Sequence, residues 1–244
     1  IFIEKTNKLI QKDNITTIFG CWTSFARKAI KPAIEKSNSL LWYPVQYEGL
    51  ESSKNIIYTG SCLNQQIYPA VRWLIKNQKK RFFLIGSNYV FPRTANKFIK
   101  AELKQQNCQV LAEEYKPLGT NDFTDIISQI KEVQPDVIFN TLNGDSNFYF
   151  YKQFHKAGIS YKETPIMAVS IAEGELQEMK EAAQGHYACW SYFQSLEIPE
   201  NEHFVSNFKK KYGSNKVTSD PIAAAYTQLY LWKGAVETAR SFNI

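Results

Sequence analysis

The sequence predicts an α/β fold in which helices cover both faces of parallel sheets, arranged as two lobes. Short β-rich runs alternate with longer helical patterns along almost all of the 244 residues. This alternation is typical of parallel sheets covered by helices. Two series of such strands fit two lobes more simply than one sheet, and the length allows two modest domains.

The first series of elements extends to residue 79. Ile30 and Ile34 lie on one face of its longest helical pattern. Pro32 inside that pattern predicts a kink, or a helix that begins closer to Pro32. In chain order we expect a helix over 2–12, a strand over 15–20, a helix over 24–37, strands over 40–44 and 55–60, and a helix that Asn64 caps and that runs to about Gln78.

The second series begins at residue 81. Its expected strands cover 81–86, 108–115, 136–142, 165–170 and 186–193. Its expected helices cover 92–106, the segment between a cap at Asp122 and Pro135, 145–157 and 200–212, and a last helix covers 220–240. We therefore expect lobe one to comprise 1–79 and lobe two to comprise 80 to about 212. The last helix has no strand after it, so 213–244 are expected to return to lobe one.

The composition is that of an ordinary globular protein. Hydrophobic residues make up 44% and charged residues 21% of the chain, and the formal net charge is +6. The two densest basic clusters, at 76–81 and 209–211, fall at predicted helix ends, where cations suit the helix dipole. They therefore indicate solvated faces and no nucleic-acid partner. No apolar run approaches the roughly 20 residues that a membrane span needs.

Signatures of enzymes and metal sites are weak. The four cysteines, Cys21, Cys62, Cys108 and Cys189, form no CxxC pair, and free thiols are favoured over disulfides. The three histidines, His155, His186 and His203, fit no HExxH pattern. There is also no GxSxG elbow, GxGxxG fingerprint or GxxxxGK[ST] loop. We expect a binding protein rather than an enzyme, with no metal and no cofactor.

Candidate binding residues follow the predicted strands. In open α/β sheets, ligands bind beyond the carboxyl ends of the strands. The segments there hold aromatic, hydroxyl, amide and carboxylate side chains: Trp22, Thr23, Ser24, Tyr43, Tyr89, Asn143, Asp145 and Glu173. They predict a site for a small polar ligand, with aromatic walls, in a cleft between the lobes. Structural roles stay open: helix caps at Ser24 and Asp145, core packing for the aromatics, and a first-turn acid at Glu173.

The same segments resemble a known family. FGCWTSFARKAIKPAIEK, LLWYPVQYEGLESSKNIIYTG, NQQIYPAV, GSNYVFPRTANK, NTLNGDSN, VSIAEGE and DPIAAAY are similar to the urea and short-amide branch of type I periplasmic binding proteins. The strongest likeness is to substrate-binding proteins of urea ABC transporters, and an amide-responsive regulator of an amidase operon is a more distant relative. The resemblance covers nearly the whole chain.

The resemblance implies two Rossmann-like lobes that close on a ligand. It also implies a further strand–helix–strand of lobe one ahead of the helix at 2–12, which this chain lacks. The expected location is periplasmic or that of a cell-surface lipoprotein, although this chain shows no signal peptide. The expected partners are ABC permease subunits, with membrane contact only through them or through a lipid anchor outside this chain.

The resemblance also implies individual ligand contacts. The family's site maps onto Ser24, Tyr43, Val45, Tyr89, Asn143, Asp145 and Ser170. Val45 and Asp145 follow the urea-transporter pattern and favour urea over acetamide. Urea has one carbonyl acceptor and four N–H donors, so Ser24 and Tyr89 would donate to it, while Asn143, Asp145 and Glu173 would accept. The alternative is an amide- or urea-sensing domain of a regulator or receptor.

Overall fold

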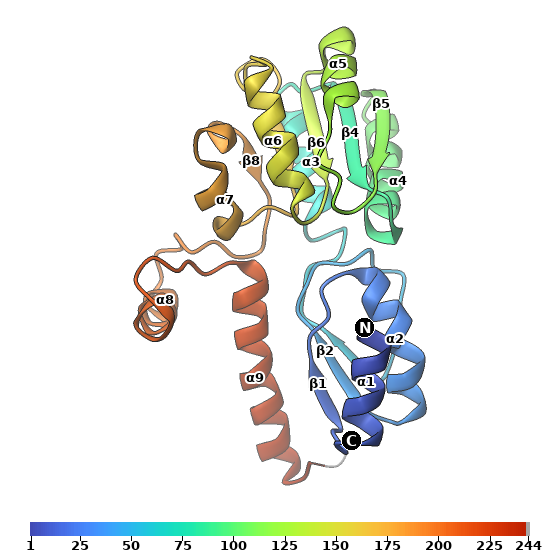
Figure 1. Ribbon diagram of the computed structural model, residues 1–244, viewed down its shortest axis with the longest axis vertical. Coiled ribbons are helices and arrows are strands. Elements are labelled where there is room, and N and C mark those ends of the chain that lie inside the picture. The colour runs from blue at the N-terminus through green and yellow to red at the C-terminus, as the bar shows by residue number, and fades with distance from the viewer. Residues whose placement is uncertain (243–244) are drawn as a thin grey trace. The chain divides into compact units, whose positions relative to one another are not determined.

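The structure, a computed structural model, describes residues 1–242 (Figure 1). It comprises two compact units, which are described separately below. Unit 1 is Ile1–Cys62 with Asp220–Ile244, and unit 2 is Leu63–Ser219. Residues 243–244, which the sequence analysis placed in the first lobe, lie outside the described residues.

Unit 1 contains a small parallel sheet with strand order β1-β2-β3. Ile30 and Ile34 from α2 pack on Leu41 and Tyr43 from β2, which forms the core of the unit. The helix α2 begins at Ser24 rather than nearer to Pro32, which lies on its exposed side. The elements are α1 (Phe2–Gln11), β1 (Thr17–Phe19), α2 (Ser24–Lys36), β2 (Leu40–Tyr43), β3 (Ile56–Tyr58) and α9 (Asp220–Ala239).

The last helix, α9, joins unit 1 through a few specific contacts. Gln228 Nε2 donates a hydrogen bond to Thr59 Oγ1 at 2.7 Å. The Trp232 ring meets the Phe19 ring edge-on, with centroids 6.1 Å apart. Most of the apolar surface of α9 remains exposed, and its buried residues are Asp220, Pro221 and Gln228. No helix within residues 1–242 has both the length and the apolar character needed to cross a membrane.

Unit 2 contains a five-stranded parallel sheet with strand order β5-β4-β6-β7-β8. Residues 82–87 of the interior strand β4 are all buried, as expected for a parallel strand covered on both faces. The strands are β4 (Arg81–Ser87), β5 (Gln109–Lys116), β6 (Val137–Thr141), β7 (Ile166–Ala168) and β8 (Tyr187–Ala188). The helices are α3 (Ile67–Lys76), α4 (Val90–Gln105), α5 (Thr124–Val133), α6 (Ser146–Lys156), α7 (Glu173–Met179), the 3-10 turn η1 (Lys180–Ala183) and α8 (Pro199–Tyr212).

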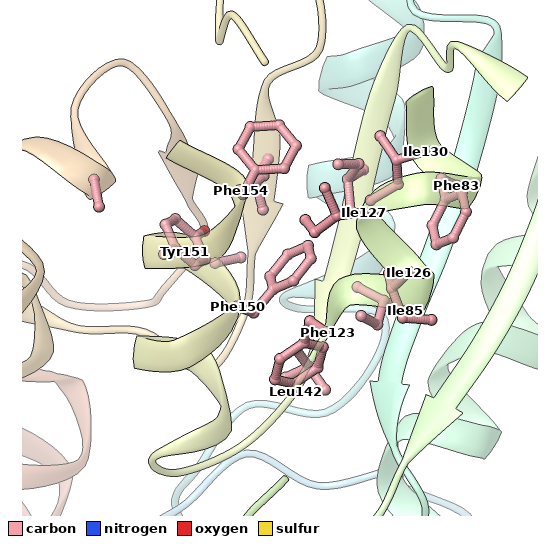
Figure 2. Close-up of a cluster of buried hydrophobic side chains, with 14 of the residues drawn as sticks. Phe83, Ile85, Phe123, Ile126, Ile127, Ile130, Leu142, Phe150, Tyr151 and Phe154 are labelled. Atoms are coloured by element: carbon pink, nitrogen blue, oxygen red, sulfur yellow. The ribbon is translucent and has the colours of Figure 1, made fainter. Parts of the chain in front are cut away.

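Two apolar clusters cover the two faces of this sheet. On one face, Phe82 and Leu84 pack against α3 and α4. On the other face, Phe83 and Ile85 share a cluster with α5 and α6. Figure 2 shows Phe150 of α6 within the second cluster, and its ring centroid lies 5.4 Å from that of Phe123. The doubly covered parallel sheet confirms the predicted α/β class.

Several details differ from the sequence-based expectations. The N-cap positions of α3 and α5 are Gln66 and Phe123 rather than Asn64 and Asp122, and residues 213–219, expected in lobe one, belong to unit 2. The helix α7 was not among the expected elements, although Glu173 was offered as a first-turn acid. The strand expected over 186–193 is limited to Tyr187–Ala188, because the following chain makes side-chain contacts instead: Trp190 Nε1 donates to the Ile171 carbonyl at 2.6 Å. The helix α3, expected in lobe one, belongs to unit 2, where Ile67 and Leu74 pack in the same cluster as β4.

His186 is partly buried at the edge of the unit 2 core, in its neutral form. Its Nδ1 accepts a hydrogen bond from the Ile166 amide at 3.0 Å. The rings of Tyr151 and Phe154 lie 5.3 and 5.6 Å from the imidazole. Burial, with a smaller contribution from His155, lowers the pKa of His186 to about 4.

Acid should therefore destabilise unit 2 through His186. The unfolded chain takes up this proton near its ordinary pKa of about 6.5, whereas the folded chain resists until about pH 4. Stability is thus present above pH 6.5 and is lost as pH falls, by about 2–3 kcal/mol at pH 4.5. Guanidinium unfolding at pH 7 and pH 4.5 measures this loss. His186→Gln should lose less than wild type, and the exposed His203→Gln should match wild type; equal losses in all three would contradict the assignment.

Candidate functional site

The carboxyl ends of parallel strands meet at one edge of a sheet, so the predicted ligand residues divide into one set per unit. The unit 1 set follows β1 and β2 and consists of Trp22, Thr23, Ser24, Tyr43 and Val45. The unit 2 set follows β4, β6 and β7 and consists of Tyr89, Asn143, Asp145, Ser170 and Glu173. Each set is described within its own unit.

In the unit 1 set, the turn between β1 and α2 combines an exposed aromatic with buried polar groups. Thr23 is the N-cap of α2, and its hydroxyl accepts from the Ala26 amide at 3.1 Å. Ser24 is therefore the first helical residue and not the cap, and it is 1% exposed. Trp22 remains 48% exposed. Trp22 is thus the aromatic of this set that is open to solvent.

Tyr43, at the end of β2, is fully buried and supports this turn. Its Oη donates a hydrogen bond to the Trp22 carbonyl at 2.9 Å. Burial raises the pKa of Tyr43 far above its ordinary value, and the neighbouring Arg27 charge only partly offsets this. The phenol therefore stays protonated and fixes the backbone of Trp22. The core-packing alternative left open by the sequence describes the Tyr43 ring well, while its hydroxyl acts on the strand end.

Arg27 organises the unit 1 set, although the sequence reasoning did not select it. Its side chain is fully buried, and Nη1 donates to Ser24 Oγ at 3.1 Å. Nη2 donates to Glu48 Oε1 at 3.0 Å, and Nε donates to Glu51 Oε1 at 2.9 Å. One guanidinium thus joins the start of α2 to the loop that follows β2.

Aromatic rings and a second cation complete the Arg27 cluster. The guanidinium carbon lies 4.7, 5.1 and 5.7 Å from the ring centroids of Tyr43, Tyr47 and Tyr58. Lys28 Nζ, on the more exposed side, lies 2.7 Å from Glu51 Oε2 and 3.1 Å from Glu48 Oε1. Burial opposes ionisation of Glu51, but hydrogen bonds from Arg27, Lys28 and Tyr58 outweigh it and lower the pKa of Glu51 to about 2. The cluster therefore contains two cations and two anions.

Val45 also belongs to the unit 1 set, and its backbone packs closely against that of Gly60. A Cβ on Gly60, just after β3, would lie 2.0 Å from the Val45 carbonyl oxygen. The φ angle of Gly60 is not positive, so its backbone conformation does not require glycine. Glycine is required because there is no room for a side chain. The close approach joins the chain after β2 to the chain after β3.

In the unit 2 set, a network of amides shapes the turn after β6. The Asn143 amide donates to Ser87 Oγ at 3.0 Å, and Asn143 Nδ2 donates to the Thr141 carbonyl at 3.1 Å. Asn140 Oδ1 accepts from the Leu142 amide, while Asn140 Nδ2 donates to Asn147 Oδ1. The NTLN segment therefore has a structural role that connects the ends of β4 and β6.

Asp145 lies in a pocket contained within unit 2. It occupies the N-cap position of α6, but its side chain makes no capping hydrogen bond and is exposed. The pocket has a volume of about 400 Å³. Its lining combines the turn before α6 with α7 and the segment at 216–217: Gly144, Asp145, Phe148, Gly174, Glu175, Gln177, Glu178, Met179, Lys216 and Val217. The Asp145 carboxylate is thus available to a ligand in this pocket.

The remaining predicted residues of unit 2 lie at neighbouring strand ends. Tyr89 is at the N-cap position of α4, and its amide donates to the Ser87 carbonyl at 2.9 Å. Ser170 follows β7 and is partly buried. Glu173 begins α7, and its Oε1 accepts from the Gln194 amide at 2.6 Å, which is a structural role. Within residues 1–242 no group of three or more His, Cys, Asp or Glu side chains could hold a metal ion.

Known proteins resemble this chain over very different extents. Limonene hydroxylase of Geobacillus stearothermophilus is 48% identical over 59 residues, which cover 24% of this chain and 11% of that protein. Leu/Ile/Val-binding protein homolog 6 of Brucella abortus (strain 2308) is 23% identical over 229 residues, which cover 92% of this chain. The chain spans 59% of the length of that Brucella relative.

The fold has counterparts among solved structures. A solute binding protein of an ABC transporter from R. palustris, crystallised with 4-hydroxybenzoate, has a TM-score of 0.90 and 21% sequence identity. The match covers 99% of this chain and 67% of that protein. The family model described as the periplasmic binding protein domain matches residues 1–244. The chain therefore belongs to the periplasmic binding protein domain family.

Proposed function

We propose that this protein captures a small neutral solute outside the cytoplasm and delivers it to the permease of an ABC importer. Membership of the periplasmic binding protein domain family supports capture rather than catalysis. The Brucella relative is a Leu/Ile/Val-binding protein homolog and the R. palustris relative is an ABC transporter solute binding protein, and both support the transport role.

The charge balance around Ser24 carries the argument for a neutral ligand. The two cations that follow Ser24 in the first turns of α2, Arg27 and Lys28, are both paired with Glu48 and Glu51. A ligand carboxylate would find these cations already neutralised. The exposed carboxylate of Asp145 in the unit 2 set would also repel an anion.

Urea or a short amide suits the polar groups that each set offers within its own unit. In unit 2, the Asn143 and Asp145 oxygens can accept from the ligand's N–H groups and the Tyr89 hydroxyl can donate to its carbonyl. In unit 1, the Ser24 hydroxyl is the candidate donor. Trp22 offers an exposed ring to cover one face of a planar ligand. One of the two carboxylate oxygens of Glu173, Oε1, is not available to a ligand, because it accepts a hydrogen bond from the Gln194 amide.

Isothermal titration calorimetry of the purified protein tests this function. The panel is urea, acetamide, leucine and 4-hydroxybenzoate, so it includes one of the amino acids after which the Brucella relative is named and the compound with which the R. palustris relative was crystallised. We expect one-to-one binding of urea or acetamide and no binding of the two carboxylates. Tight binding of leucine or 4-hydroxybenzoate would contradict the neutral-ligand proposal.

Asp145→Ala should weaken urea more than acetamide. Urea has a second amino group where acetamide has a methyl group, so only urea loses a partner for that group. The loss of one such hydrogen bond corresponds to about tenfold in affinity. Asp125→Ala is the matched control, because Asp125 is an exposed aspartate of unit 2 that pairs with Lys116. Equal losses for urea and acetamide would exclude Asp145 as the discriminating acceptor.

A further inference from the structure

We propose that unit 2 carries a second ligand site, separate from the predicted ligand residues, that binds a dicarboxylic amino acid such as glutamate. The site is a pocket of about 700 Å³ where the carboxyl ends of α5 and α6 meet the first residues of β4. The charged side chains that line it are Arg81, Lys131, Asp136 and Glu163. This inference does not depend on the proposed function.

The pocket lies at the end of the unit 2 sheet opposite to the predicted ligand residues. Arg81 is the first residue of β4, and Asp136 directly precedes β6. Tyr89 and Asn143 instead follow the other ends of the same two strands. Because β4 has seven residues, its two ends are about 20 Å apart at roughly 3.3 Å per residue. A small molecule in this pocket would therefore not reach the predicted ligand residues.

Arg81 is anchored at both its backbone and its side chain. The amides of Lys80 and Arg81 both donate to Asp136 Oδ2 at 2.9 Å, so the backbone engages this carboxylate oxygen. Arg81 Nη2 donates to the Val133 carbonyl at the end of α5 at 2.7 Å. A guanidinium has five N–H donors, and its planar fork binds a carboxylate through two of them. The donors that Val133 does not use can therefore hold a ligand carboxylate.

Lys131 and Glu163 add one charge of each sign to the pocket. Both side chains are exposed, and neither takes part in an ion pair within residues 1–242. Gln134 and Ala157, the C-caps of α5 and α6, also line the pocket, and the carboxyl end of a helix favours a positive group. The pocket therefore offers two cations for anionic groups, and one carboxylate with two helix ends for a cationic group.

A dicarboxylic amino acid carries this combination of charges. Its two carboxylates would pair with Arg81 and Lys131, and its ammonium would pair with Glu163. Leucine and 4-hydroxybenzoate each have a single carboxylate, so they would leave one of the two cations without a partner. Glutarate has both carboxylates but no ammonium, so it would leave Glu163 unpaired beside a dianion. The comparison of glutamate with glutarate therefore isolates the contribution of Glu163.

Isothermal titration calorimetry of the purified protein with L-glutamate and with glutarate tests the site. Glu163→Gln removes the partner of the ammonium, and Lys131→Gln removes one of the two cations. Lys162→Gln is the matched control, because Lys162 is an exposed neighbour of Glu163 that does not line the pocket. Asp145→Ala tests whether glutamate occupies the predicted ligand residues instead.

We expect wild-type protein to bind one glutamate and to prefer it over glutarate by about tenfold, the worth of one charged hydrogen bond. Glu163→Gln should abolish this preference, whereas Lys131→Gln should weaken both ligands by about tenfold. Lys162→Gln and Asp145→Ala should bind glutamate as the wild type does. The inference is overturned if wild-type protein binds no glutamate, if Glu163→Gln weakens both ligands equally, or if Asp145→Ala loses glutamate binding. Urea binding is measured separately, so these outcomes leave the proposed function to its own test.

Discussion

Arg27→Met is expected to lower the free energy of unfolding of unit 1 by about 3–5 kcal/mol, because it leaves buried carboxylates without their partner. Glu48 is buried, and its Oε2 already has no hydrogen-bond partner. Methionine fills much of the arginine volume, so the loss reports mainly on the charges. Guanidinium unfolding, with amide hydrogen exchange to locate the loss in unit 1, measures the effect.

Two further variants separate the buried pair from the exposed one. Lys28→Gln should cost no more than about 1 kcal/mol, because partly exposed ion pairs contribute little. Combining Arg27→Met with Glu48→Gln and Glu51→Gln should recover part of the stability, because the uncompensated charges are gone. A triple variant as unstable as Arg27→Met would show that packing around the three tyrosines, and not charge, gives the cluster its stability.

Phe150→Ala is expected to destabilise unit 2 by about 3–5 kcal/mol. Its ring is fully buried at the centre of the cluster on one face of the sheet, between Phe123 and Phe154 (Figure 2). Removing it leaves a cavity beside the rings of Phe123, Tyr151 and Phe154. Denaturant unfolding, with hydrogen exchange in α5 and α6, measures the loss.

Tyr149→Ala is the matched control for this prediction. Tyr149 precedes Phe150 in α6 but is 39% exposed. Its removal should change the stability by no more than about 0.5 kcal/mol. Similar losses for both variants would mean that the helix α6, rather than the buried ring, determines the effect.

Most helices and strands could be predicted because the spacing of apolar residues that identifies them is visible within a short stretch of sequence. The buried run of β4 and the apolar face of α2 at Ile30 and Ile34 are visible in the sequence. The helix α7 was not among the expected elements, although Glu173 was considered as a first-turn acid, because Glu173 and Gly174 show no apolar period and the helix is only seven residues long. The placement of α3 was missed because its apolar face at Ile67 and Leu74 would fit either lobe equally well.

The site was predictable to a smaller extent. The strand-end rule selected Ser24, Tyr43 and Asp145 from position alone, and the structure places all three after or at the ends of strands. Arg27 was missed because its partners Glu48 and Glu51 are more than twenty residues away. One local signal was available, since Arg27 lies three residues after Ser24 on the same helix and residues at that spacing are neighbours.

The close approach of Gly60 to Val45 has a consequence for how this protein can diverge. The contact is with the carbonyl oxygen of residue 45, not with its side chain. The Gly60 contact therefore places no restriction on the side chain at position 45, which is limited instead by its burial in the unit 1 core. Any side chain at position 60 would instead displace the chain after β2. Among homologous sequences, we therefore expect residue 60 to remain glycine wherever the loop after β2 keeps its course, whereas this contact does not restrict the identity of residue 45.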